Sequence, residues 1–70
     1  MRYAIVIEQS ENNFGAWVPD LPGCVATGKS VEVVQRRIRE AIALHLAGMR
    51  EDGDSIPSPT VRVEYVDVAA

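Results

Sequence analysis

The fold is decided by residues 17–24, which read Trp-Val-Pro-Asp-Leu-Pro-Gly-Cys. Proline fixes the backbone angle φ and glycine permits angles that other residues resist, so this stretch predicts a rigid corner between two strands. Gly28 and Ser30-Val31-Glu32 follow it. Serine is a favourable helix N-cap, and an acidic residue in the first turn suits the positive end of the helix dipole. The stretch therefore predicts a strand end, a corner, a short third strand and a helix start.

Working outward, the residues before the corner predict a β-hairpin. Residues 2–9 are rich in Tyr, Ile and Val and form a run too short for a typical helix, which indicates a strand. Residues 10–13 form a polar turn with two asparagines. Residues 14–18 form the second strand, and residues 24–27 form the third.

The residues after Ser30 predict an amphipathic helix and then a last strand. Gly53 suits the helix C-terminus, and Pro57 and Pro59 forbid its continuation. Residues 60–68 alternate in the manner of a strand. The apolar face of the helix recurs at spacings of three and four, at Val34, Ile38, Ala41, Ile42, His45 and Met49.

These elements predict one α+β domain over residues 1–70, in the order β-β-β-α-β. The first three strands form an antiparallel meander, and the helix crosses over to a fourth strand. One helix covers only one face of such a sheet. Yet the first strand is apolar on both faces, with Ile5 and Ile7 on one and Ala4 and Val6 on the other. An uncovered apolar face usually marks an interaction surface, so we expect a partner or a second copy there.

Composition and charge exclude several classes of protein. The net charge of −3 argues against general nucleic-acid binding, because phosphate contact needs a surplus of Lys and Arg on one surface. No apolar stretch approaches the ~20 residues that span a bilayer, and Met1-Arg2 leads straight into a strand-like run, so we expect no secretory signal. The single cysteine excludes an internal disulfide. These features predict a soluble cytoplasmic protein without metal or cofactor.

Catalytic interpretations of the polar residues are weak. Cys24 and His45 would be a nucleophile and its base, but no Asp or Asn is evidently placed to orient the imidazole. A metal-dependent nuclease would need converging carboxylates, which Glu8, Glu64 and Asp67 do not supply. Arg36, Arg39 and Arg50 are interpreted as the solvated face of the helix. Asp52-Gly53-Asp54 is interpreted as a turn rather than a calcium loop.

An ordered set of short motifs spans nearly the whole chain: Pro19-Asp20-Leu21-Pro22-Gly23-Cys24, Gly28, Ser30-Val31-Glu32, Ala41, His45-Leu46, Asp52-Gly53, Ile56-Pro57 and Pro59. As a set they resemble the N-terminal domain of HicB antitoxins. The resemblance implies a partial RNase H-like scaffold of β-β-β-α-β order that lacks the nuclease active site. It also implies a domain that oligomerises and neutralises HicA, a small mRNA-cleaving toxin.

The chain departs from that family in two respects. Many HicB antitoxins carry a C-terminal DNA-binding domain, whereas this chain stops at Ala70, so we expect neither that domain nor direct DNA binding. The family often has two acidic residues early in the helix, where this chain has Glu32-Val33-Val34.

The resulting hypothesis is a non-enzymatic antitoxin that binds a HicA-type toxin and forms a homo-oligomer, a dimer or alternatively a tetramer. A stand-alone oligomeric binding module and a metal-dependent nuclease on a degenerate RNase H-like sheet remain the alternatives. The exposed part of the corner is the expected toxin-facing surface, with Trp17 pointing outward. The last strand is the expected oligomer interface. The two sets are Trp17, Pro19, Asp20, Leu21 and Pro22 for the toxin, and Val61, Val63 and Tyr65 for the oligomer.

Overall fold

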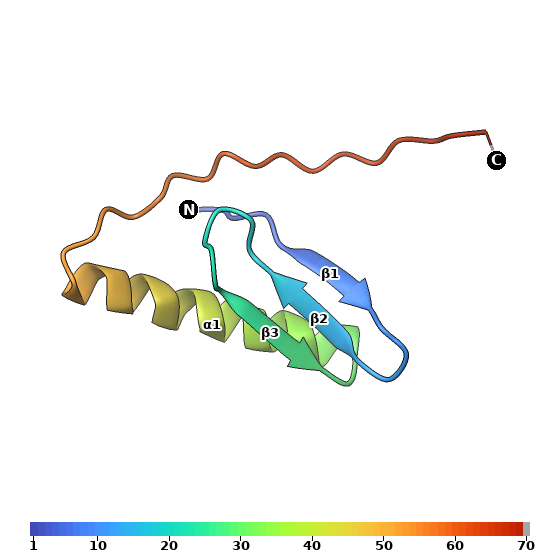
Figure 1. Cartoon of the computed structure of the whole chain (residues 1–70), viewed down its shortest axis with the longest axis horizontal. Coiled ribbons are helices and arrows are strands. Elements are labelled where there is room, and N and C mark those ends of the chain that lie inside the picture. Colours follow the sequence, from blue (N-terminus) through green and yellow to red (C-terminus); the bar gives the residue numbers. More distant parts are fainter. Residues whose placement is uncertain (70) are drawn as a thin grey trace.

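The computed structural model describes residues 1–69, and Ala70, the last residue of the predicted domain, lies outside them. A three-stranded antiparallel sheet of order β1-β2-β3 packs one face against a single helix (Figure 1). This is the predicted α+β class. The elements are β1 (Val6–Gln9), β2 (Phe14–Trp17), β3 (Val25–Gly28) and α1 (Val31–Glu51).

The predicted hairpin is present, with a shorter first strand than expected. The Ser10 amide donates to the Asn13 carbonyl at 2.8 Å, which closes the turn between β1 and β2. β1 begins at Val6 rather than at residue 2, because Val6, opposite Trp17, is the first residue that pairs with β2. Residues 1–5 precede the paired strand.

The corner between β2 and β3 consists of two consecutive turns. Leu21 donates to the Val18 carbonyl at 3.0 Å, and Cys24 donates to the Leu21 carbonyl at 3.0 Å. Gly23 has a φ of 85°, the left-handed angle that favours glycine. Because both turns fold back on the sheet, Leu21 is only 1% exposed. The expectation that Leu21 lies on the exposed part of the corner is therefore wrong.

The helix begins and ends as the sequence predicts. The Ser30 hydroxyl accepts from the Val33 amide at 3.2 Å, and Asp52 caps the other end before Gly53, whose φ is 74°. His45, which the sequence predicts on the apolar face, is half-buried. The neighbouring Leu46, which that prediction does not include, packs against the core. Within residues 1–69, no helix combines the length and the apolar character needed to cross a bilayer.

The core lies between the sheet and the first half of α1. On β2 the side chain of Ala16 points inward, as does that of Val18 directly after the strand, and both meet the helix. Partly buried side chains from residues 3–7 and from the second half of α1 extend this cluster. The fully buried residues are Ala16, Val18, Leu21, Cys24, Val34 and Ile38.

The predicted fourth strand is not formed in this chain. Residues 54–69 contain no paired strand, and the segment runs away from the sheet along the top of the view in Figure 1. From Val61 onward its apolar side chains are exposed, from 40% at Val61 to 97% at Tyr65. A strand needs a neighbour to bond with, and the segment has none within the described residues.

Candidate functional site

The sheet face opposite the helix carries a row of apolar side chains across all three strands. Val6 pairs with Trp17, and Trp17 pairs with Val25, so the three lie side by side. Trp17 is 37% exposed and Val25 is 63% exposed, because α1 covers only the other face. The predicted outward orientation of Trp17 is confirmed. We call these three residues the outer row.

The sequence alone does not single out two members of the outer row. It predicts Val6 only as part of an apolar face of the first strand. Val25 carries the same signal, since it alternates with Cys24 and Ala26, which face the helix. Strand alignment was needed to place these two beside Trp17.

The corner continues this surface at the end of β2. Pro19 and Asp20 are half-buried and Pro22 is exposed. Leu21 lies beneath them, and its burial holds the two turns against the sheet. Four of the five predicted contact residues therefore reach the surface, while Leu21 supports them from below.

Asp20 binds the C-terminal segment. Its Oδ1 accepts from the Thr60 hydroxyl at 2.7 Å, and its Oδ2 accepts from the amides of Thr60 and Val61 at 3.1 and 3.2 Å. We call these three hydrogen bonds the Asp20 anchor. The Thr60 hydroxyl is the main reason that the pKa of Asp20 lies below its ordinary value. The two amides lower that pKa further, and partial burial opposes the shift.

A second contact holds the same segment nearby. The Tyr3 hydroxyl donates to the Pro57 carbonyl, 54 positions along the chain. The segment is thus attached to the body at the corner and at the residues before β1. No local pattern in the sequence predicts either contact, because each joins residues that are remote in the chain.

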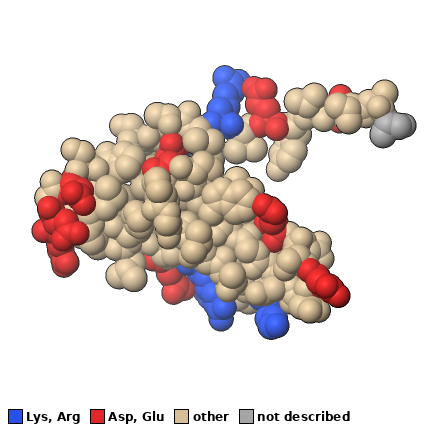
Figure 2. Space-filling view, viewed as in Figure 1, with Lys and Arg blue, Asp and Glu red and all other residues tan. Residues whose placement is uncertain are grey.

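Charge is distributed around the edges of the molecule. In the view of Figure 2, where the strands lie in front of α1, acidic groups lie at both ends and in the upper part of the body. Basic groups lie along its lower edge, and an uncharged area lies between them. The outer row contributes to such an uncharged face, since it contains no ionisable side chain. This surface suits an apolar contact with charged margins.

Among the polar residues weighed for catalysis, Cys24 is buried, and Glu8 lies two positions after Val6 on the same sheet face. Burial raises the pKa of the Cys24 thiol, which disfavours the reactive thiolate. Glu8, Glu64 and Asp67 are exposed, the last two on the C-terminal segment. Across residues 1–69, no group of three or more His, Cys, Asp or Glu side chains is placed to hold a metal ion.

The fold and its surface define a small α+β domain with one open, apolar sheet face. The chain belongs to the HicB-like antitoxins of bacterial toxin-antitoxin systems, and the model of that family matches residues 3–69.

Relatives of the chain occur in bacteria, archaea and a phage. It is 40% identical over 67 residues to a UPF0150 protein of Archaeoglobus fulgidus, covering 91% of this chain and 97% of that one. It is 51% identical over 47 residues to a UPF0150 protein of Helicobacter pylori, covering 67% of this chain and 65% of that one. A 14.9 kDa protein from the rep-hol intergenic region of Haemophilus phage HP1 is 33% identical over 67 residues, which cover 96% of this chain.

The chain spans half the length of that phage relative. No solved structure gives a significant match to the chain.

Proposed function

We propose that this protein is an antitoxin that neutralises a HicA-type, mRNA-cleaving toxin by direct binding in the cytoplasm. Membership of the HicB-like antitoxin family supports a role in toxin control and favours binding over catalysis. The observation that carries the proposal is the outer row, an exposed apolar surface that α1 leaves open.

The toxin contact in this proposal is the outer row together with the exposed side of the corner. Trp17 is its centre, because large aromatic side chains dominate the binding energy of many protein interfaces. Pro19 and Pro22 present a preformed loop, which loses little conformational entropy on binding. The Asp20 carboxylate lies at the margin of this surface, where the Asp20 anchor fixes its position.

Charge supports the same choice of partner. The antitoxin carries a net charge of −3, and a nuclease that binds RNA needs a basic surface. Opposite charges speed encounter and discourage wrong partners. The bound antitoxin would then stop cleavage by covering the surface of the toxin that holds the RNA, and it would need no catalytic activity of its own.

The proposed antitoxin acts as a homo-oligomer, with a dimer as the first expectation. Val61, Val63 and Tyr65 are its proposed contact residues, and all three are exposed in the single chain. A chain of this size has a small core, so association is a natural source of added stability.

The test is co-expression with the product of the adjacent reading frame in the native genome. We expect that product to be a small basic protein that stops growth alone and is tolerated with the antitoxin. The purified pair should form a complex in which Trp17→Ala weakens binding by about 2 kcal/mol or more, as measured by calorimetry.

Leu44→Ala is the matched control, because Leu44 is an equally apolar side chain, 77% exposed, on the helix rather than the sheet. It should leave toxin affinity unchanged. Equal losses for the two variants would reject the outer row as the toxin surface. A toxic neighbour that neither binds nor is neutralised would reject the antitoxin function and leave a stand-alone module as the better account.

A further inference from the structure

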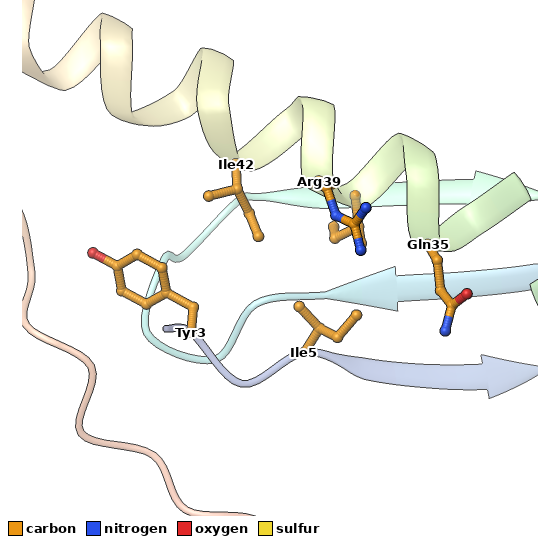
Figure 3. A pocket seen from close by; sticks show the side chains of 6 residues that line it. Tyr3, Ile5, Gln35, Arg39 and Ile42 are labelled. Atoms are coloured by element: carbon orange, nitrogen blue, oxygen red, sulfur yellow. The ribbon is translucent and has the colours of Figure 1, made fainter. Parts of the chain in front are cut away.

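The hydrophobic core of the single chain is open at the free edge of β1. Because α1 packs chiefly against β3 and β2, a groove of about 280 Å³ lies between the helix and the start of the chain beside β1 (Figure 3). Ile5 faces the groove from the residues before β1, and Ile42 and Arg39 face it from α1. The groove is lined by Tyr3, Ile5, Gln35, Ile38, Arg39 and Ile42.

The C-terminal segment has the complementary properties. Arg62 Nε lies 3.2 Å from Glu64 Oε1, as expected for side chains two apart on one face of an extended strand. The opposite face carries Val61, Val63 and Tyr65, which are 40%, 53% and 97% exposed. Over residues 61–65 the segment is therefore already shaped as a strand, with a paired polar face and an exposed apolar face.

The two attachments of this segment determine where it leaves the body. The Asp20 anchor and the bond from Tyr3 to Pro57 hold residues 57–61 beside the start of β1. Beyond Val61 the segment does not return to its own groove but runs outward (Figure 1). One chain thus presents an unfilled groove and an unpaired strand at the same time.

We propose that the two features complete each other between two copies of this chain. The C-terminal segment of one copy pairs with the free edge of β1 of the other, and Val61, Val63 and Tyr65 enter the groove. The exchange is reciprocal about a two-fold axis, as in isologous dimers. This inference deepens the homo-oligomer part of the proposed function, and it does not depend on the toxin.

Length and chemistry fit this arrangement. Residues 61–68 span about 26 Å when extended, and residues 3–9 of the edge span about 23 Å, at ~3.3 Å per residue. The free edge of β1 exposes backbone donors and acceptors that a new strand would satisfy. The groove walls include Ile5, Ile38 and Ile42, so they suit valine and tyrosine side chains.

The first measurement is the molar mass of the full chain by light scattering. We expect about twice the 7.7 kDa of one chain. Val63→Asp should give the monomer mass while its circular dichroism retains the helix, because Val63 is 53% exposed and supports no core of its own chain. Arg62→Ala changes the opposite face of the same segment and should remain dimeric.

The second measurement locates the contact by hydrogen exchange. The β1 amides that point away from β2 should be protected in the wild type and exchange roughly tenfold faster in Val63→Asp, while those of β2 and β3 are unaffected. A monomer mass for the wild type would overturn the proposal. This holds even if the β1 edge is protected, because the C-terminal segment would then pair with β1 of its own chain. So would a dimer that survives Val63→Asp. Toxin affinity is measured separately through Trp17, so either proposal can fail alone.

Discussion

The carboxylate of Asp20 and the hydroxyl of Thr60 are joined at 2.7 Å across 40 positions of the sequence. This bond and the two amide bonds beside it attach the C-terminal segment to the corner between β2 and β3. The corner proposed to face the toxin and the segment proposed to join two copies thus meet at one side chain. Changes at Asp20 should therefore affect the segment as well as the corner.

Asp20→Asn should loosen the C-terminal segment without unfolding the sheet. The variant keeps the size of the side chain but replaces one acceptor oxygen with a donor, so it cannot accept all three hydrogen bonds. We expect faster hydrogen exchange at Thr60 and Val61 and unchanged exchange in α1. Asp54→Asn is the control, and an equal effect of both variants would contradict the role of the Asp20 anchor.

The Asp20 anchor should depend on pH in acid. The hydrogen bonds from Thr60 and Val61 hold the pKa of Asp20 below its ordinary value of 3.8 in the folded chain. The anchor therefore contributes its full stabilisation at pH values above 3.8 and loses it as the pH falls through the lower, folded pKa. The amide chemical shifts of Thr60 and Val61 should report this transition, which Asp20→Asn should abolish. An apparent pKa above 3.8 would contradict the prediction.

Leu21→Ala should destabilise the fold far more than Pro22→Ala. Leu21 is 1% exposed and packs in the core, so its truncation should lower the free energy of unfolding by about 2–5 kcal/mol. Pro22 is exposed, and its replacement should change stability by about 0.5–1 kcal/mol, chiefly through the unfolded state. Urea unfolding at one fixed protein concentration measures both. Similar losses would mean that Leu21 is not a core residue.

Two glycines should respond in opposite directions to alanine. At Gly28 a Cβ would meet Val33 Cγ1 at 2.9 Å and the Val34 backbone nitrogen at 3.0 Å, so Gly28→Ala should destabilise by about 1–3 kcal/mol. Gly48 lies inside α1 with nothing within 4 Å of its Cβ position. Gly48→Ala should therefore stabilise the helix by about 0.5–1 kcal/mol. Thermal unfolding by circular dichroism compares the two, and a stabilising Gly28→Ala would refute the close approach of β3 and α1.

Local signals in the sequence were sufficient for most of the fold. The N-cap at Ser30 and the positive φ of Gly23 and Gly53 depend on neighbouring residues only, and all three are confirmed. The outward orientation of Trp17 follows from alternation along β2, since Ala16 and Val18 are buried. These features could be predicted because the chemistry that determines them lies within a few residues.

The features that depend on distant partners could not be predicted in this way. Alternation over residues 60–68 predicts a strand that would pair well, but it does not say which chain supplies the neighbour. Prolines on both sides of Leu21 favoured an exposed loop, whereas the two turns direct that side chain into the core. The Asp20 anchor joins residues 40 positions apart, and neither residue signals the other.

The alternation of β2 has a consequence for how such a domain changes during evolution. Trp17 lies between two residues that build the core, yet its own side chain points the other way. Positions 6, 17 and 25 can therefore be substituted without disturbing the side chains that hold the sheet to the helix. Descendants of one gene could acquire different partners on an unchanged scaffold, with divergence concentrated at every second strand position.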